Sequence, residues 1–157
     1  MEYKMNTRIR LTEIPKDLMA TMMNTEETIN KMDFDDKLLA LIRLRVSQIN
    51  QCAYCIDMHF KESLAAGENI QRLYSVNVWQ ETAYYSAEER ACIAWAEYIT
   101  LPFKKHDEQA LFDVLLSFFD KEKIANLTLV IIQINAWNRL MKSFGIEVGG
   151  YQVRQHE

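Results

Sequence analysis

The scarcity of glycine and proline is the feature that most constrains the fold of this chain. Its 157 residues include only 4 Gly and 2 Pro, whereas 49% of them are hydrophobic. Gly and Pro interrupt regular structure most strongly, and folds built from short strands need many of them in their turns. Long, apolar, uninterrupted segments are typical of helices instead, so we expect an all-α fold.

Helical spacing and end signals predict where these helices lie. Pro15 precedes the first of them, Gly67 can end the third, and Ser86 followed by Glu89 has the spacing of a capping box. We expect helices at about 16–31, 37–49, 52–66, 86–100, 107–119 and 121–144. Residues 69–83 carry only a short, aromatic pattern, and no segment alternates as a strand. A compact bundle of about six or seven helices is predicted.

The chain is expected to form one domain over residues 1–157. It contains no low-complexity tract, no linker rich in Gly, Pro or Ser, and no internal repeat. A length of 157 residues is that of one ordinary domain with one hydrophobic core.

Charge and hydropathy exclude several classes of partner. The formal net charge of −4 comes without a basic run, so nucleic acid is not an expected ligand. No apolar run approaches the roughly 18 residues of a membrane-spanning helix, and the first residues lack a secretory signal. We therefore expect a cytoplasmic protein without a membrane partner. Three cysteines in such a protein indicate thiol chemistry, metal binding or core packing.

The segment Cys52-Ala-Tyr-Cys55-Ile-Asp-Met-His59 carries the chemistry. Spacings of three and four residues place both sulfurs and the imidazole on one face of a helix. Backbone N–H groups at the start of that helix favour an anion and would lower a thiol pKa there. The thiolate is the form that attacks a peroxide or a disulfide.

The two cysteines have other interpretations. A zinc site needs four ligands, and beyond this segment only Cys92, His106 or His156 could complete one, so no metal is expected. A structural disulfide over three residues would close a tiny loop and remove little entropy, which suits a bond that is made and broken. Burial as two core cysteines remains an alternative. A thioredoxin-like site would require a strand before the motif, whereas both flanks here are helical.

The run from Leu44 to His59 resembles the core of the alkylhydroperoxidase D (AhpD)-like branch of the carboxymuconolactone decarboxylase family. The resemblance covers most of residues 35–145. It continues at Gly67-Glu68, Arg72-Leu73, Trp79, Glu89-Arg90-Ala91, Ala94-Trp95-Ala96-Glu97, Thr100 and Ile134-Asn135-Ala136-Trp137-Asn138-Arg139.

The resemblance implies an all-helical subunit that assembles through helix faces into homotrimers or homohexamers and reduces hydroperoxides with a vicinal thiol pair. It implies that Cys55 is the peroxidatic thiol, Cys52 the resolving thiol and His59 a proton-relay residue. The residues themselves leave the assignment open, because the helix start favours Cys52 as the more acidic thiol and His59 favours Cys55. The implied reductant is an external thiol or dithiol, in related proteins a lipoyl-bearing partner, and no cofactor is expected.

One position departs from the family pattern. A relay Glu is expected twelve residues before the first motif cysteine, where this chain has Ala40. Ala40 and His59 lie about equally far from the turn at Asn50 and would face each other across a helical hairpin. We therefore expect weak peroxidase activity, and a gain of about ten-fold on Ala40→Glu, unless Glu89, Glu97 or water supplies the missing acceptor.

The remaining residues have mainly structural interpretations. Cys92 lies among apolar neighbours and is expected in the core. His106 is expected in a surface loop, and Glu89 and Glu97 as solvated or paired carboxylates at the surface, unless one of them is buried and replaces the missing relay acid. Three tryptophans are predicted to fill the core or subunit contacts, unless one of them lines the thiol pocket: Trp79, Trp95 and Trp137.

Two functions follow from these residues. The first is a hydroperoxide-reducing enzyme in which Cys55 is oxidised and Cys52 then forms a disulfide with it. The second is a non-catalytic redox sensor or assembly protein that uses the same disulfide as a switch.

Overall fold

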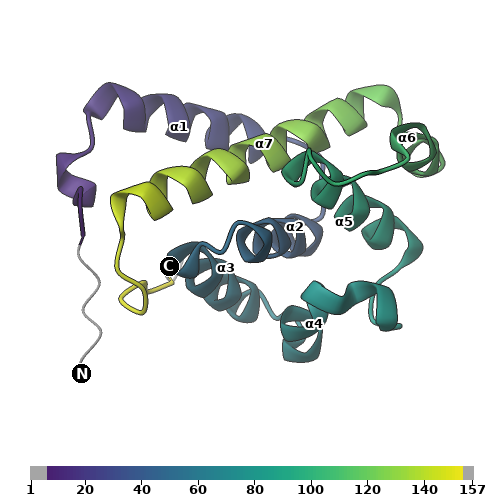
Figure 1. The fold of residues 1–157 in the computed structure, drawn as a ribbon, viewed down its shortest axis with the longest axis horizontal. Coiled ribbons are helices and arrows are strands. Elements are labelled where there is room, and N and C mark those ends of the chain that lie inside the picture. The colour runs from purple at the N-terminus through teal and green to yellow at the C-terminus, as the bar shows by residue number, and fades with distance from the viewer. Residues whose placement is uncertain (1–6, 154–157) are drawn as a thin grey trace.

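The computed structural model describes residues 7–153, and every regular element in that range is helical (Figure 1). In chain order the elements are η1 (Leu11–Glu13), α1 (Lys16–Ile29), α2 (Asp36–Ile49), α3 (Ala53–Ala65), α4 (Ile70–Ser75), η2 (Val76–Glu81), α5 (Ala87–Thr100), α6 (Glu108–Leu116) and α7 (Lys121–Phe144). Over the described residues this confirms the predicted all-α fold with seven α-helices; η1 and η2 are short 3-10 segments.

The predicted end signals act as expected. The Ser86 hydroxyl accepts a hydrogen bond from the Glu89 backbone N–H at 3.2 Å, and the Glu89 carboxylate accepts one from the Ser86 N–H at 2.7 Å. Gly67 adopts a left-handed φ of 78° after α3. The sequence prediction assigned no helix to residues 69–83, and the structure corrects it with α4 and η2, the second of which is kinked at Val78.

Helix α2 is the centre of the fold. It contacts α3, α5 and α7, and its buried residues point to all sides rather than along one stripe. Seven residues of α2 are buried: Leu38, Leu39, Leu41, Ile42, Leu44, Val46 and Ser47. Because α2 is enclosed in this way, the turn that follows it and the start of α3 are fixed from several sides.

Helices α1 and α7 lie side by side across one face of the molecule, with α2 and α3 beneath α7 in the view of Figure 1. Of α1 only Ile29 is buried, so most of this helix covers the molecule rather than filling its core. None of the helices in residues 7–153 is both long and apolar enough to cross a lipid bilayer.

Candidate active site

The turn between α2 and α3 positions the first motif cysteine. The backbone N–H groups of Gln51 and Cys52 donate to the carbonyls of Gln48 and Ser47, both at 3.0 Å, which is the Schellman arrangement at a helix end. Gln51 takes the left-handed conformation that this arrangement needs, with φ of 54°. Cys52 directly follows it and is the N-cap of α3. The predicted helix start at about Cys52 is therefore correct to within one residue.

A buried amide network ties this turn to α7. The side-chain N–H₂ of Asn50 donates to the side-chain oxygens of Asn135 at 2.9 Å and Asn138 at 3.0 Å. The amide of Asn138, which is fully buried, donates to the Ser47 hydroxyl at 3.0 Å. Lys142 donates to the Asn50 carbonyl at 3.1 Å. The turn that carries the cysteines is thus held against a second helix by groups with few alternative partners.

Cys52 and Cys55 form a disulfide, with their Cα atoms 5.3 Å apart. Both are almost completely buried, at 2% and 1% exposure, in an apolar cluster with Ile14, Met141 and Ile146. The two residues differ in their surroundings, because Cys55 lines a cavity whereas Cys52 is not among its lining residues. Cys55 also lies in the first turn of α3, where backbone N–H groups are free to stabilise a thiolate.

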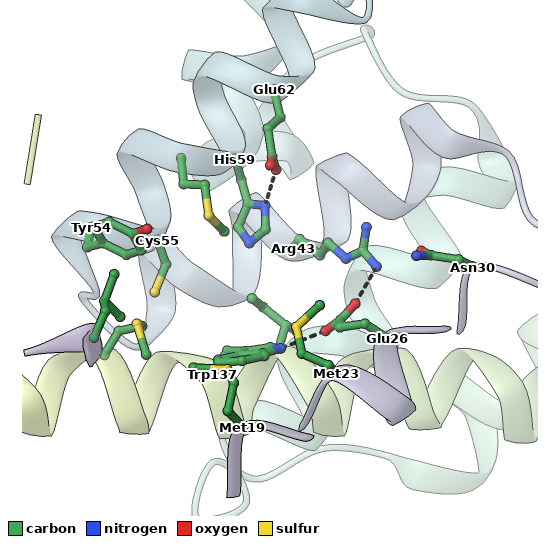
Figure 2. A pocket seen from close by; sticks show the side chains of 14 residues that line it. Met19, Met23, Glu26, Asn30, Arg43, Tyr54, Cys55, His59, Glu62 and Trp137 are labelled. Carbon is green, nitrogen blue, oxygen red and sulfur yellow. Dashed lines mark hydrogen bonds and ion pairs between the residues drawn. The ribbon is translucent and has the colours of Figure 1, made fainter. Parts of the chain in front are cut away.

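His59 follows Cys55 by one turn of α3 and lines the same cavity. Its Nδ1 lies 3.1 Å from Oε2 of Glu62, which is one turn further along the same helix. Its Nε2 is buried and has no hydrogen-bond partner among residues 7–153. Figure 2 shows the ring between Cys55 and Glu62, with Nδ1 joined to the carboxylate and the other nitrogen directed into the cavity.

The C-terminal segment of the described chain fixes Glu62 from the other side. The Tyr151 hydroxyl donates to Oε1 of Glu62 at 2.5 Å. Lys61 holds this segment on α3, since its ammonium donates to the carbonyls of Gly149 at 3.2 Å and Tyr151 at 3.1 Å and to Asp57 at 2.8 Å. A residue 89 positions away in sequence therefore supports the carboxylate beside His59.

These contacts define the proton positions in the site. Burial pushes the pKa of Glu62 upward, but hydrogen bonds from His59 and Tyr151 and the positive charges of His59 and Arg43 outweigh it and leave this pKa below its ordinary value. Glu62 is therefore an anion at neutral pH and can only accept hydrogen bonds. When the imidazole is neutral, its proton therefore lies on Nδ1, and Nε2 then faces the cavity as an acceptor.

The cavity has a volume of about 420 Å³ and is mostly apolar. Methionine supplies much of its wall, and α1, α2, α3 and α7 all contribute to it (Figure 2). Its lining residues are Leu11, Met19, Met23, Glu26, Asn30, Arg43, Tyr54, Cys55, Met58, His59, Glu62, Ile134, Trp137 and Met141. Burial, with the nearby charges of Glu62 and Asp57, raises the pKa of Tyr54, so its phenol stays protonated near neutral pH.

A second polar group lies across the cavity from the imidazole. Glu26 of α1 accepts hydrogen bonds from the Trp137 indole at 2.7 Å and from the Arg43 guanidinium at 3.2 Å. Figure 2 shows this pair of contacts closing the side of the cavity opposite His59 and Glu62. Trp79 and Trp95 pack in two of the core clusters, as expected, whereas Trp137 lines the pocket and is the exception that the sequence prediction allowed for one tryptophan.

The expectation that His59 lacks a carboxylate partner is wrong. Ala40 does occupy the family position on α2, but Glu62 already meets Nδ1. The two substitutes considered from the sequence are engaged elsewhere. Glu89 pairs with Arg72 and caps α5, and Glu97 accepts from Arg45 and Trp79. Glu97 is also buried, at 6% exposure, because these partners satisfy it, so the expected surface position was wrong for this residue.

Two other predicted positions have clear outcomes. Cys92 is fully buried in the core, as expected, and burial together with the charges of Glu88 and Glu89 raises its pKa to about 12. His106 lies in the loop between α5 and α6, as expected, but is half-buried because its ring packs edge-on against Tyr98 at 5.6 Å. No group of three His, Cys, Asp or Glu side chains in the described part of the chain is arranged to hold a metal ion.

The sequence prediction missed three polar residues of the site. Glu62 was accessible to it, because a spacing of three residues from His59 places both on one helix face. Glu26 and Arg43 belong to different helices, and their ion pair depends on how α1 lies against α2 and α7. No local sequence pattern predicts an ion pair that depends on the packing of separate helices.

Comparison with known proteins shows the family that this chain matches. Residues 16–98 match the carboxymuconolactone decarboxylase family. The uncharacterized protein YdfG of Bacillus subtilis (strain 168) is 37% identical over 141 residues, which are 90% of this chain and 96% of YdfG.

Solved structures agree with this match. ATU0492 from Agrobacterium tumefaciens, a protein of unknown function with a suggested role as the antioxidant defence protein AhpD, superposes with a TM-score of 0.87 at 31% identity and covers 93% of this chain and 100% of its own. The debrominase Bmp8 shares the fold alone, with a TM-score of 0.75 at 19% identity over 85% of this chain and 72% of its own. The chain belongs to the AhpD-like branch of the carboxymuconolactone decarboxylase family.

Proposed function

We propose that this protein is a thiol-dependent peroxidase that reduces organic hydroperoxides. One observation carries the proposal: Cys52 and Cys55 form a disulfide, and Cys55 lines a cavity that also receives the Nε2 atom of His59, which has no hydrogen-bond partner among residues 7–153. A thiol next to a buried acceptor nitrogen can lose its proton inside the site, and the cavity offers room for a peroxide.

The proposed reaction has two steps in the protein. His59 takes the thiol proton of Cys55, and the thiolate attacks the terminal oxygen of the hydroperoxide. The S–O bond forms as the O–O bond breaks, and the alkoxide leaves as an alcohol with the proton from His59. Cys52 then gives up its thiol proton and attacks the sulfenic sulfur, so that the S–S bond forms as the S–O bond breaks, and the leaving hydroxide takes up that proton and departs as water. An external dithiol reduces the disulfide and is itself oxidised.

The surroundings of the two sulfurs support Cys55 as the attacking thiol. Cys55 lines the cavity, follows the first N–H groups of α3 and precedes His59 by one turn. Cys52 is the N-cap of α3 and is not among the residues that line the cavity. A resolving thiol needs to reach only the partner sulfur, whereas the peroxidatic thiol must meet substrate.

We propose a thiol or dithiol reductant in the cytoplasm, and a lipoyl-bearing protein is a donor of this class. Access is the difficulty for any donor, because both sulfurs are nearly inaccessible in the oxidised structure. The same burial favours the second candidate, a redox sensor that is oxidised once and then changes an assembly. Continuous turnover separates the two, since a sensor would stop after one equivalent.

The direct test is mass spectrometry of the reduced protein after one equivalent of cumene hydroperoxide. We expect the loss of two hydrogens and a Cys52–Cys55 bond, and Cys52→Ser should trap a sulfenic acid on Cys55. Cys92→Ser serves as the control, because Cys92 lies in another cluster and should not affect the result. Oxidation at Cys92 in the natural protein would contradict the assignment. Turnover with dithiothreitol then distinguishes an enzyme from a sensor.

We also propose a homo-oligomer, a homotrimer or homohexamer, that assembles through helix faces. Large apolar side chains are exposed together on α4 and η2, among them Ile70, Tyr74 and Val78 at 53%, 59% and 45% exposure. Light scattering at micromolar concentration should give a mass above the 18.5 kDa of one chain. The double variant Ile70→Lys, Tyr74→Lys should lower it, and a monomeric natural protein would contradict the proposal.

A further inference from the structure

The size of the cavity indicates a bulky substrate. Its 420 Å³ lies within the range of about 300 to 1,000 Å³ that small-molecule sites occupy. A hydrogen peroxide molecule, slightly larger than water with its roughly 30 Å³, would leave most of it empty. The methionines Met19, Met23 and Met58 offer flexible, polarisable walls that adapt to organic groups of different shape.

The charges of the cavity restrict that organic group further. Its lining contains two carboxylates, Glu26 and Glu62, and one guanidinium, Arg43, which gives a formal charge of −1 with His59 neutral. Arg43 is the only lining residue with a fixed positive charge that could bind an anionic substrate, and Glu26 already pairs with it at 3.2 Å. An incoming carboxylate would therefore meet a neutralised arginine and two like charges.

Glu26 is itself firmly held in this position. The Trp137 indole donates to its other oxygen at 2.7 Å, and both members of the Glu26–Arg43 pair are about four-fifths buried. The pair joins α1 to α2, and the indole joins it to α7. For an anionic substrate to recruit Arg43, this three-helix contact would have to break, leaving a partly buried carboxylate without its counter-ion.

We propose that this pocket selects uncharged organic hydroperoxides and rejects those that carry a carboxylate, with the Glu26–Arg43 pair as the determinant of that selectivity. The inference rests on the peroxidase function proposed above. Glu26 is a specificity residue in this scheme, because it acts on the substrate's charge through Arg43 and takes no part in the bond changes at sulfur.

A matched pair of substrates tests the proposal. Cumene hydroperoxide with a para-carboxylate and the methyl ester of the same compound differ mainly in charge. At equal concentrations of the two hydroperoxides, we expect the ester to oxidise the cysteines of the natural protein at least about ten-fold faster than the acid does. Repulsion between like charges in a partly buried site has an effect of that order. Glu26→Gln removes one carboxylate and frees Arg43, so the ester-to-acid ratio should fall by about ten-fold or more.

Glu27→Gln is the control, because Glu27 is exposed on the same helix and its substitution removes the same charge as Glu26→Gln does. Its ester-to-acid ratio should match that of the natural protein. A natural protein that handles the acid as well as the ester, or a ratio that Glu26→Gln leaves unchanged, would overturn the proposal.

Binding of the corresponding unreactive alcohols separates this inference from the peroxidase function. Quenching of tryptophan fluorescence reports occupancy of a pocket lined by Trp137 without any chemistry. If the ester alcohol binds at least about ten-fold more tightly than the acid alcohol while neither hydroperoxide oxidises Cys55, the charge selectivity stands and the peroxidase function fails. Equal binding of the two alcohols overturns the selectivity whatever the peroxidase assay gives.

Discussion

Replacing Glu62 with glutamine removes the charge beside His59 while leaving a side chain of the same shape. A glutamine oxygen can still accept from Nδ1, so the change isolates the electrostatic support of the imidazolium that forms when Cys55 loses its proton. Two unit charges 3.1 Å apart attract by ~1.3 kcal/mol in bulk water and by ~5 kcal/mol at an effective dielectric constant of about 20.

Solvent screening decides which of these two interaction energies applies to Glu62 and His59. The Glu62 side chain is 40% exposed, so the loss should lie near the lower one. A loss of about 1.4 kcal/mol in the transition state is a ten-fold loss of rate. We therefore expect Glu62→Gln to slow the oxidation of reduced protein by about ten-fold at pH 7, in the range usual for an acid that orients a functional histidine.

Stopped-flow measurement of disulfide formation with excess cumene hydroperoxide gives this rate across pH. The difference between natural protein and variant should narrow above the ordinary thiol pKa of about 8.5, where Cys55 ionises without help. Glu27→Gln should behave as the natural protein. An unchanged rate in Glu62→Gln at neutral pH would refute the assignment of Glu62 as the partner of His59.

The variant Ala40→Glu tests the same reasoning by adding a carboxylate instead of removing one. The sequence alone predicts a gain of about ten-fold, on the premise that no acid meets His59. Since Glu62 already accepts from Nδ1, we now expect no gain in the natural background and a partial recovery in Glu62→Gln. A ten-fold gain in the natural background would show that Glu62 does not serve the relay.

Three further predictions concern stability and reactivity. Because burial raises the pKa of Cys92 to about 12, this thiol should resist iodoacetamide at pH 8 until the chain unfolds, and its labelling in the native protein, detected by mass spectrometry, would contradict the structure. Asn138→Ala strands the partners of a fully buried amide and should lower the free energy of unfolding by about 2 kcal/mol in urea, whereas Asn24→Ala on the exposed face of α1 should not. The pKa of Glu62 is lower in the folded state than the unfolded value of about 4.3, so its contribution to stability is complete above that value and is lost as the pH falls through the folded one. The difference in unfolding free energy between the natural protein and Glu62→Gln should therefore disappear in acid, and a difference that grows there would contradict the sign of the shift.

Local signals in the sequence were sufficient for most of the fold. The capping box at Ser86 and Glu89 and the left-handed Gly67 are set by a few neighbouring residues, and both helix ends follow them. Residues 69–83 were not assigned because α4 and η2 are short and owe their form to packing. Leu73, Val76 and Trp79 join the core cluster of α2 and α5 there, a tertiary contact that overrides a weak local pattern.

The site divides in the same way. The sequence predicts that Cys52, Cys55 and His59 lie together, because spacings of three and four residues place them on one face of a helix, and the structure has Cys55 and His59 on α3 with Cys52 at its N-cap. The family resemblance predicts the carboxylate partner of His59 at position 40, whereas in the structure this partner is Glu62, which accepts a hydrogen bond from Tyr151. Contacts of this kind depend on how the C-terminal segment returns to α3, which the sequence does not encode in any local pattern.

The left-handed turn at Gln51 limits which substitutions this position can accept. Its side chain is exposed and lines no part of the cavity, so a surface criterion would class it as freely variable. Its φ of 54° makes a β-branched residue such as Val or Ile strained there, whereas Gly or Asn would be relaxed. Variation at position 51 should thus be narrow for a reason of backbone geometry, and a protein library randomised there should retain only a small set of side chains although none of them touches the thiols.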